Sequence, residues 1–361
     1  MTVVIPIPKS EKDVSAEWVT AALGSATNRP VSSVAVRRIG DGRGVTSLVF
    51  RLELSYEGKE AGPASLIVKF PGTSLQADPS RPARQYGFYE REVHFYRELA
   101  PEVAIAPRCY WCEFDAGSGE FGILLEDLTG YDQEDDRRGF SAASLRRCVE
   151  VLATMHAKWW QSPRLATCDF LFTVDGTNTR RLAEGHTSSW PSFLERYGHL
   201  LPPGYEAFRP PLLRSLQVAG TALAAAPRTL VHLDFRTDNV FFGGDLRGTV
   251  AIDWQLVARG AAVLDLVTLL SNSTATDLRR QVEGELLHMW HDSVVRTTAT
   301  SYSFEQAAAD FRRWLLFQVV RTVIAGASVL PVGQAGELIA IFAQRTFACA
   351  IDHSADDFVV R

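Results

Sequence analysis

The sequence lacks the features that would place it in several large classes of protein. Its five cysteines are an odd number, scattered over 361 residues, and so do not suit the disulfide framework of a small secreted domain. No apolar run approaches the roughly 18 residues that a membrane span needs. The 37 Lys and Arg residues are outnumbered by 42 Asp and Glu, giving a net charge of −5. This balance argues against a nucleic-acid or anionic-membrane surface as partner.

Targeting, zinc-binding and repeat signals are also missing. Residues 1–10 contain two prolines and no basic-then-apolar layout of a secretory signal, so we predict a cytoplasmic protein. Cys109 and Cys112 form a C-x-x-C, but no second pair follows to complete a four-ligand zinc site. Internal repeats and low-complexity tracts are absent from the sequence. The length and the 46% hydrophobic content instead indicate two lobes with a substantial core.

The first third of the sequence has the composition of an antiparallel sheet. A short amphipathic helix is expected near residues 15–23, and the apolar periodicity of residues 88–99 predicts another that ends before Pro101. Alternating apolar residues predict strands over residues 31–39, 45–56, 65–70, 109–114 and 121–126. We therefore predict an N-terminal lobe, residues 1–128, in which one helix packs on an antiparallel sheet.

A glycine-rich stretch, residues 40–44, lies at the expected hairpin tip between the first two strands. Gly42 and Gly44 would let backbone N–H groups approach phosphate oxygens closely. Thr46 and Ser47 could add hydroxyl donors. These residues are candidates for binding a nucleotide, although G-x-G at a hairpin is also compatible with a simple turn.

Lys69 ends the third expected strand and is flanked by apolar residues. A lysine at this place can pair with the α and β phosphates of a nucleotide; the alternative is a surface lysine at a strand end. Glu92, in the following helix, is a candidate to clamp this lysine, and Glu90 competes for that role. The apolar surroundings of Glu92 lead us to predict that Lys69 contacts Glu92 and that Glu90 faces solvent.

An apolar strand leads into the connector between the predicted lobes. Glu126 and Leu128 stand where an adenine could take two backbone hydrogen bonds. Because backbone contacts leave little trace in a sequence, this assignment rests on position alone.

Residues 129–361 are predicted to form a mainly helical C-terminal lobe. A polar loop near residues 131–139 marks the break between the lobes. His156 is expected to be a satisfied core histidine, and Asp265 a helix-start or loop-anchoring residue. Helices are predicted from residue 141 to about residue 159 and over residues 212–226, 262–271, 278–296, 304–325 and 335–350.

The second lobe contains an H-x-D-x-x-x-x-N motif at His232, Asp234 and Asn239, and Asp253 follows fourteen residues later. In a phosphoryl-transfer site one Asp orients and deprotonates an attacking hydroxyl, while an Asn and a second Asp hold Mg²⁺ on the triphosphate. A turn at residues 243–245 and a strand through Val250 would return Asp253 beside Asn239 as a β-hairpin. A lone H-x-D is also common as a structural feature, so this interpretation depends on the nucleotide-binding half.

Taken in order, these features resemble the aminoglycoside phosphotransferase/choline kinase-like family, small-molecule kinases with a fold related to that of protein kinases. The resemblance covers roughly residues 30 to 350, and its motifs are specific jointly rather than singly. The matching segments are E-V-H-F-Y at residues 92–96, L-E-D-L at 125–128, L-A-T-M-H-A at 152–157, and D-W-Q at 253–255 followed by D-L at 265–266.

The resemblance implies an α+β, two-lobe protein-kinase-like fold and a set of roles. It implies Asp234 as the catalytic base, Asn239 and Asp253 as Mg²⁺ ligands, and Lys69 with Glu92 as the ion pair that orients the phosphates of ATP or GTP. Leu233 departs from the family, because many members have Gly between the His and the Asp. The acceptor stays open, since family members phosphorylate antibiotics, amino-alcohols, sugars and steroid-like alcohols.

Three other functions compete with that of a small-molecule kinase. A protein kinase is disfavoured because Asp253 is followed by Trp-Gln rather than Phe-Gly, and no A-P-E follows. A non-catalytic kinase-like module is disfavoured because Lys69, Asp234, Asn239 and Asp253 are all present. A metal-dependent hydrolase using His232 and the aspartates would act without nucleotide. We therefore predict ATP- and Mg²⁺-dependent transfer of the γ-phosphate to a small-molecule hydroxyl, by a monomer or homodimer without nucleic-acid or membrane partners.

Overall fold

The computed structural model describes residues 5–27, 29–39, 47–58, 62–71, 87–174, 176–244, 248–328 and 332–360. The chain divides into two compact units. The first comprises Met1–Tyr131 together with Gly244–Gln255, and the second comprises Asp132–Gly243 together with Leu256–Arg361. The sequence predicted two consecutive lobes that meet at residues 128 and 129, whereas the segment that contains Asp253 belongs with the first unit.

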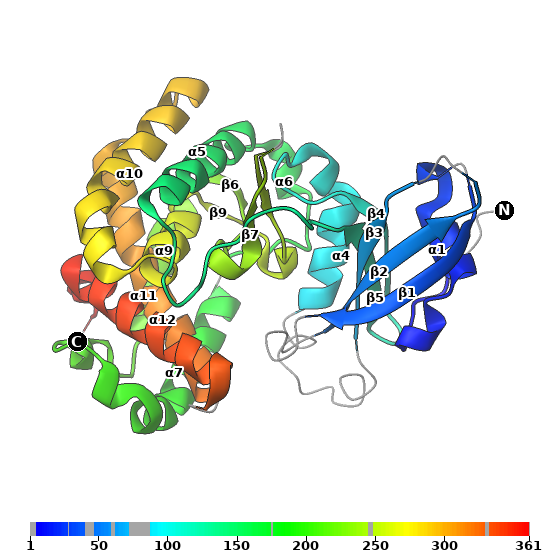
Figure 1. The fold of residues 1–361 in the computed structure, drawn as a ribbon. Coiled ribbons are helices and arrows are strands. Elements are labelled where there is room, and N and C mark those ends of the chain that lie inside the picture. The colour runs from blue at the N-terminus through cyan, green and yellow to red at the C-terminus, as the bar shows by residue number, and fades with distance from the viewer. Residues whose placement is uncertain are drawn as a thin grey trace. The chain divides into compact units, whose positions relative to one another are not determined.

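The first unit contains a five-stranded antiparallel sheet in the order β1-β2-β3-β5-β4 (Figure 1). This sheet confirms the predicted architecture of the N-terminal lobe. The short β8 (Thr249–Ala251) also belongs to this unit. The sheet strands are β1 (Val31–Ile39), β2 (Leu48–Tyr56), β3 (Ser65–Phe70), β4 (Cys109–Asp115) and β5 (Glu120–Glu126).

Alternating burial explains why these segments form strands. In β3, Leu66, Val68 and Phe70 are fully buried, while the residues between them are half-buried. Phe50 and Leu52 of β2 are also buried, and they lie opposite Val68 and Leu66 in the register. The period-two pattern therefore places one face of the strands in the core.

Among the described residues of this unit, two α-helices pack against strands, where one had been expected on the sheet. The first, α1 (Ala16–Leu23), begins at Ser15, whose hydroxyl accepts a hydrogen bond from Trp18 N as an N-cap. Trp18 is buried in the same hydrophobic cluster as β2 and β3. The second helix, α4 (Phe88–Glu98), packs against β4 and β5 and buries Val93 and Phe95 completely. Both segments were predicted as helices, and the structure confirms both.

The second unit is mainly helical, as predicted. Its longer helices are α5 (Ala142–Lys158), α7 (Gly176–Tyr197), α8 (Leu213–Ala225), α9 (Val263–Asn272), α10 (Thr276–Thr298), α11 (Phe304–Ser328) and α12 (Gly333–Asp352); the short α6 spans Pro163–Ala166. Helix α7 had not been predicted. Its strands are β6 (Arg228–Val231), β7 (Val240–Phe242) and β9 (Ala258–Ala261), of which β6 and β9 pair antiparallel.

Helix α9 forms the centre of the second unit. Every one of its ten residues is buried, which is the pattern of a helix covered on all sides rather than of a surface helix. It packs against α11 and α12 (Figure 1). Its first turn carries Asp265, so a carboxylate is fixed inside an apolar core and must be satisfied there.

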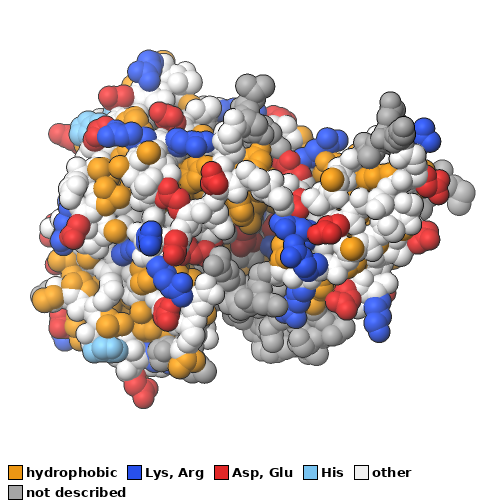
Figure 2. Space-filling model, viewed as in Figure 1, with side chains coloured by type: hydrophobic (Ala, Val, Ile, Leu, Met, Phe, Trp, Pro, Cys, Tyr) orange, Lys and Arg blue, Asp and Glu red, His pale blue; other side chains and the backbone are white. Residues whose placement is uncertain are grey.

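The described surface carries charges of both signs. Figure 2 shows Lys and Arg side chains interspersed with Asp and Glu side chains on both units, in keeping with the small net charge. Among the described helices, none combines the length and the apolar character required to cross a bilayer.

Candidate active site

Lys69 is the centre of an ion-pair group in the first unit. Its Nζ lies 2.7 Å from Glu92 Oε2 and 2.9 Å from Asp253 Oδ1. The Glu92 side chain is 1% exposed, whereas Glu90 on the same helix is exposed. The predicted contact between Lys69 and Glu92 is therefore present, and Asp253 is a second partner that the sequence had not indicated.

The protonation of this group follows from its burial and its charges. Burial alone would lower the pKa of Lys69, but the adjacent Asp253 and Glu92 carboxylates outweigh burial and raise it. The ammonium therefore stays charged. Burial raises the pKa of Glu92, and the Lys69 ammonium opposes that shift. Lys69 is thus a fixed cation, and its direction is set by two carboxylates.

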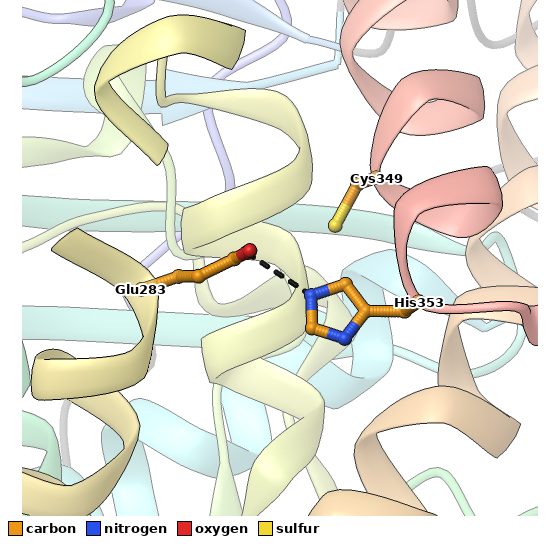
Figure 3. A group of neighbouring side chains, drawn as sticks. All are labelled: Glu283, Cys349 and His353. Atoms are coloured by element: carbon orange, nitrogen blue, oxygen red, sulfur yellow. Dashed lines mark hydrogen bonds and ion pairs between the residues drawn. The ribbon is translucent and has the colours of Figure 1, made fainter. Parts of the chain in front are cut away.

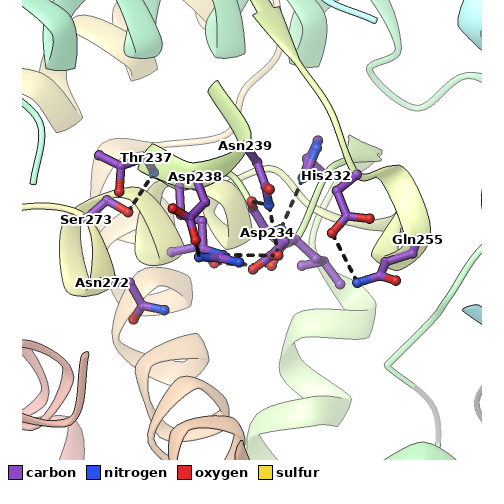
Figure 4. Close-up of polar contacts among 12 residues, drawn as sticks. His232, Asp234, Thr237, Asp238, Asn239, Gln255, Asn272 and Ser273 are labelled. Carbon is purple, nitrogen blue, oxygen red and sulfur yellow. Dashed lines mark hydrogen bonds and ion pairs between the residues drawn. The ribbon is translucent and has the colours of Figure 1, made fainter. Parts of the chain in front are cut away.

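Asp253 is positioned by the packing of its neighbours. Its backbone has φ of +65°, in the left-handed region, and Gln255 Nε2 donates to its Oδ2 at 3.2 Å (Figure 4). The fully buried Trp254 stacks on Phe95 of α4, with ring centroids 4.1 Å apart. Phe95 follows Glu92 by three residues, so both lie on the same face of α4. Helix α4 therefore carries Glu92 and, through the contact of Phe95 with Trp254, also supports Asp253.

The predicted phosphate-binding hairpin lies mainly outside the described residues. Gly42, Gly44 and Thr46 all fall there, so their assignment stays a prediction. Ser47 is described and is 8% exposed, immediately before β2. Ser47 is therefore largely shielded from solvent, and its role as a hydroxyl donor stays a prediction.

The connector after β5 is fixed by hydrogen bonds and by one ion pair. Glu126 N donates to Arg108 O at 2.9 Å, and Tyr131 N donates to Leu128 O at 3.0 Å. Arg51 lies against Asp127, with its Nε 2.9 Å from Oδ2 and its Nη2 3.2 Å from Oδ1. This pair could not be predicted from the sequence, because its partners are 76 residues apart.

Asp234 and Asn239 meet in the second unit. The side-chain amide of Asn239 donates at 2.9 Å both to the backbone oxygen of Asp234 and to its Oδ2 (Figure 4). Arg236 Nε lies 3.3 Å from the same Oδ2, and its Nη1 lies 2.6 Å from Asp238 Oδ2. The Asp234 side chain remains 16% exposed. The five-residue spacing thus brings both predicted side chains to one point.

Asp234 is held as an anion. Burial alone would raise its pKa, but the positive charges of Arg236 and Arg321, with a smaller contribution from His232, overcome burial and lower it. The carboxylate is therefore ionised at neutral pH and able to accept a proton. Arg236, two residues after Asp234, is a functional candidate that the sequence analysis missed, although the D-x-R spacing was available as a signal.

A buried scaffold holds the start of this loop. Asp265 accepts hydrogen bonds from His232 N at 2.9 Å and from Leu233 N at 2.7 Å. His156 Nε2 lies 3.1 Å from Asp265, and Trp290 Nε1 donates to His156 Nδ1 at 3.0 Å. An indole N–H can only donate, so Nδ1 must accept and Nε2–H donates to Asp265. The predicted roles of His156 as a satisfied core residue and of Asp265 as a loop anchor are confirmed.

Leu233, the departure from the family motif, has a backbone φ of +64°. Glycine occupies this left-handed region without cost, whereas other residues are strained there by roughly 1–2 kcal/mol. The Leu233 side chain is 4% exposed, and its carbonyl oxygen accepts from Arg321 Nη2 at 3.1 Å. Burial of the Leu233 side chain offsets the strain that Gly would avoid, whereas the carbonyl hydrogen bond would be available to Gly as well.

The other end of the loop is fixed by residues that the sequence did not single out. Thr237 N donates to Ser273 Oγ at 3.2 Å (Figure 4), and the Thr237 hydroxyl contacts Asp136. Arg345, 7% exposed, donates to the backbone oxygens of Asp136 at 3.1 Å and of Asn272 at 3.0 Å. Helices α9 and α12 therefore both hold the segment that contains Asp234.

The structure brings the predicted residues together in two groups. Lys69, Glu92 and Asp253 meet in the first unit, and Asp234 and Asn239 meet in the second. The β-hairpin that would bring Asp253 beside Asn239 joins residues of different units, so that proximity stays a prediction.

A separate cluster in the second unit has ligand types that can bind a metal. Glu283, Cys349 and His353 place their ligand atoms within 4.8 Å of one another (Figure 3). Arg279, with a side chain that is 1% exposed, lies 2.6 Å from Glu283 Oε2 and also pairs with Asp352. Burial raises the pKa of Cys349 to about 12, so its thiol is protonated at neutral pH. We therefore interpret the cluster as a buried ion-pair network centred on Arg279.

Comparison with known proteins agrees with this geometry. Residues 31–302, well over half of the chain, match the model of the phosphotransferase enzyme family, and the chain belongs to this family. The predicted class of small-molecule O-kinase is thereby confirmed. No curated protein matches the sequence.

Solved structures show the same fold at low sequence identity. A microcompartment-associated aminopropanol kinase is 17% identical with a TM-score of 0.53, covering 95% of this chain and 99% of that one. A choline kinase from Cryptosporidium parvum is 13% identical with a TM-score of 0.52, covering 89% of each chain. An ethanolamine kinase from Plasmodium vivax is 11% identical with a TM-score of 0.51, covering 96% of this chain and 90% of that one. The fold is the two-lobe kinase-like fold that the sequence predicted.

Proposed function

We propose that this phosphotransferase transfers the γ-phosphate of ATP, in the presence of Mg²⁺, to a hydroxyl group of a small molecule. The observation that carries the proposal is the ionised Asp234 carboxylate, fixed by Asn239 and Arg236 at the start of a buried scaffold. Such a carboxylate can accept the proton of an attacking hydroxyl, provided that the hydroxyl comes within hydrogen-bond reach.

The first unit supplies the groups proposed to hold the nucleotide. Lys69 is a permanent cation directed by Glu92, which suits it to pair with phosphate oxygens. The N–H of Glu126 donates to Arg108, and the carbonyl of Leu128 accepts from Tyr131. We assign the purine edge to the backbone of the connector at Glu126 and Leu128, as its position at the end of β5 suggests.

Asn239 and Asp253 are the residues proposed to hold Mg²⁺. Carboxylate and amide oxygens are the hard ligands that this ion prefers. The Asn239 amide nitrogen is committed to Asp234, which leaves its Oδ1 as the ligand atom. The Asp253 side chain is 25% exposed, and its charge is balanced by Lys69. When bound, the ion would neutralise charge on the transferred phosphate.

The acceptor is proposed to be a small hydroxyl compound of the amino-alcohol, sugar, aminoglycoside or other natural-product type. Three structures that share the fold are named as kinases of aminopropanol, choline and ethanolamine. Amino-alcohols are accordingly the first compounds to screen for ATP consumption, with the other classes tested in parallel.

The proposal is tested with Asp234→Asn and Asp253→Asn on the acceptor that such a screen selects. Asp234→Asn keeps the shape of the side chain but removes the base, so turnover should fall by roughly 10²–10⁴-fold with little change in nucleotide affinity. Asp253→Asn should also weaken Mg²⁺–nucleotide binding, because its charge is needed at the metal. Asp277→Asn, at a side chain that is 94% exposed, is the matched control. Near-normal turnover in Asp234→Asn would remove this residue from the proposed role.

A further inference from the structure

A cavity of about 560 Å³ lies within the second unit. Its walls come from the start of α7, from α8, from the paired strands β6 and β9, and from α9. Asp234 and Asn239 are not among the described residues that line it. The volume falls within the range of small-molecule sites, which is roughly 300–1,000 Å³.

The pairing of β6 with β9 places two arginines on one face of this strand pair. Arg228 lies opposite Ala261, and Leu230 lies opposite Arg259. Residues directly opposite each other share a face, and so do residues two apart on one strand. Arg228 and Arg259 are therefore diagonal neighbours, at a separation of roughly 7–8 Å that long side chains can bridge. Both arginines line the cavity.

Like charges in this arrangement are unfavourable unless an anion lies between them. Burial, followed by the positive charge of Arg259, lowers the pKa of Arg228. The described residues that line the cavity include neither Asp nor Glu. Within the described part of this cavity, the two guanidinium groups thus have no carboxylate to balance them.

Hydrogen-bond donors in the cavity are available to a ligand. Arg259 Nε is buried and makes no hydrogen bond to any described residue, and Arg259 Nη1 reaches Leu165 O only at 3.4 Å. Arg228 donates from both Nε and Nη2 to one acceptor, the carbonyl oxygen of Ala224. The first residue of α7, Gly176, also lines the cavity, so the positive end of a 22-residue helix faces the same space.

Of the remaining described residues that line the cavity, Thr173, Thr179, Gln217 and Thr221 are polar, and Val174, Leu223, Ala224, Ala261 and Leu264 form apolar walls. We propose that the cavity is a binding site for a small organic anion, whose carboxylate or phosphate group lies between Arg228 and Arg259 and whose apolar body contacts these walls. A guanidinium fork matches either acid bidentately. The site is distinct from the one proposed for phosphoryl transfer. Because β6 leads directly into His232 and Asp234, an anion that ties β6 to β9 would also steady the start of the catalytic segment.

The test is isothermal titration calorimetry of the full chain with hexanoate and hexyl phosphate at low ionic strength. Hexanol, hexylamine and inorganic phosphate are titrated beside them. At least one of the two amphiphilic anions should bind, and the better of the two identifies the acid group. Equal binding of hexanol would overturn the role of the arginines, and equal binding of inorganic phosphate would overturn the role of the apolar walls.

The variants Arg228→Gln and Arg259→Gln should each weaken anion binding roughly 10- to 100-fold, the expected cost of losing a hydrogen bond to a charged group. Arg181→Gln removes one charge at an exposed position of α7 and should bind as the unaltered chain does. In anion-free buffer, Arg259→Gln should melt at the same or a higher temperature, because it relieves repulsion. Equal binding by Arg181→Gln and Arg259→Gln would overturn the proposal.

Two further variants separate this site from its surroundings. Asp234→Asn should keep full anion binding, and loss of binding there would mean that the ligand occupies the phosphoryl-acceptor site instead. Asp175, which precedes Gly176 in the sequence, lies outside the described residues. Asp175→Asn should bind the anion as tightly or more tightly, because it removes a negative charge; weaker binding would count against an anion site.

Discussion

The two units of the molecule hold their proposed functional residues in different ways. In the first unit, charged side chains fix one another: Lys69 lies between Glu92 and Asp253. In the second unit, a buried carboxylate fixes the backbone: Asp265 accepts from the N–H groups of His232 and Leu233. The first arrangement sets the direction of a charge, and the second sets the conformation of a loop.

This difference predicts different consequences of damage. Lys69 has two carboxylate partners, so the loss of one of them leaves its charge paired with the other, and function should suffer more than stability. A backbone that loses its acceptor leaves buried N–H groups unsatisfied, and each costs roughly 1–3 kcal/mol. A substitution at such a site in the second unit should therefore lower both stability and function. A substitution in the ion-pair group of the first unit should lower function more than stability.

Asp265→Ala should have the largest effect on stability. It removes the acceptor for two backbone N–H groups and for His156. The free energy of unfolding should fall by roughly 3–5 kcal/mol, and displacement of Asp234 by about 1 Å should lower turnover on the order of 10²-fold. Denaturant titration and the kinase assay measure the two losses.

Asp265→Asn keeps one acceptor oxygen and the shape of the side chain, so it should lose less stability than Asp265→Ala and remain folded for assay. Asp292→Asn, at a side chain that is 70% exposed, is the control and should change stability by less than about 0.5 kcal/mol. Unaltered stability in Asp265→Ala would show that the loop does not depend on this acceptor.

The contrast between the units also explains what could be predicted from the sequence. The strands and the Lys69–Glu92 pair follow from local periodicity, because β3 and α4 each show one buried face. Asp265 could be recognised as an anchor because a carboxylate in an apolar run must be satisfied. Arg345 and Arg321 could not, since their partners are backbone oxygens far away in the sequence.

Helix α7 and the arginine-lined cavity were missed for similar reasons. The α7 sequence contains Gly185 and Pro191 within the helix, together with several Thr and Ser residues, all of weak helix propensity. Packing against α8 and α11 overrides that preference. The diagonal placement of Arg228 and Arg259 depends on the register of β6 with β9, which a sequence does not specify for strands of four residues.

Two buried histidines of the second unit differ in their hydrogen bonding. His156 and His186 are both fully buried, but His156 is hydrogen-bonded through both ring nitrogens, whereas His186 makes no hydrogen bond to any described residue. Burial lowers the pKa of His186 from 6.5 to about 4. The folded state therefore binds fewer protons than the unfolded state between these values.

Stability should be complete above about pH 6.5, fall as the pH drops below that value, and stop falling near pH 4. The loss from this one group should be about 3 kcal/mol, at 1.36 kcal/mol for each pKa unit. His186→Phe should remove this part of the pH dependence, as measured by denaturant titration between about pH 7.5 and about pH 4.5. His199→Phe, at an exposed position, should leave the dependence unchanged. An unaltered slope in His186→Phe would assign the loss to other groups.

Glu92→Gln breaks the ion pair of the first unit at a smaller cost. The amide keeps the size of the side chain but not its charge, and Lys69 retains Asp253 as a partner. Turnover at a fixed ATP concentration should fall roughly 10- to 100-fold, while the free energy of unfolding changes by less than about 1 kcal/mol, because burial already disfavours the Glu92 charge. Glu90→Gln, exposed on the same helix, should change neither quantity. If stability fell with activity in Glu92→Gln, the contrast between the two units would fail.

Substitutions at Leu233 are expected to show the smallest difference in stability. They test whether the backbone next to Asp234 is strained. Both units place one residue of the site at positive φ, Asp253 at +65° and Leu233 at +64°. Removing the buried Leu233 side chain costs stability in Leu233→Ala and in Leu233→Gly alike. At positive φ, however, Gly is relaxed and Ala is strained. Leu233→Gly should therefore be more stable than Leu233→Ala by about 1 kcal/mol.

The matched control is Leu216, fully buried within α8. A helical backbone reverses the preference, because Gly costs about 1 kcal/mol relative to Ala in a helix interior. Leu216→Gly should therefore be less stable than Leu216→Ala by about that amount, and the order of the two variants should invert between the sites. Denaturant titration of the four variants measures both differences directly. If the Ala variant were the more stable one at both Leu216 and Leu233, the backbone at Leu233 would be unstrained. Burial of the Leu233 side chain would then have no strain to offset.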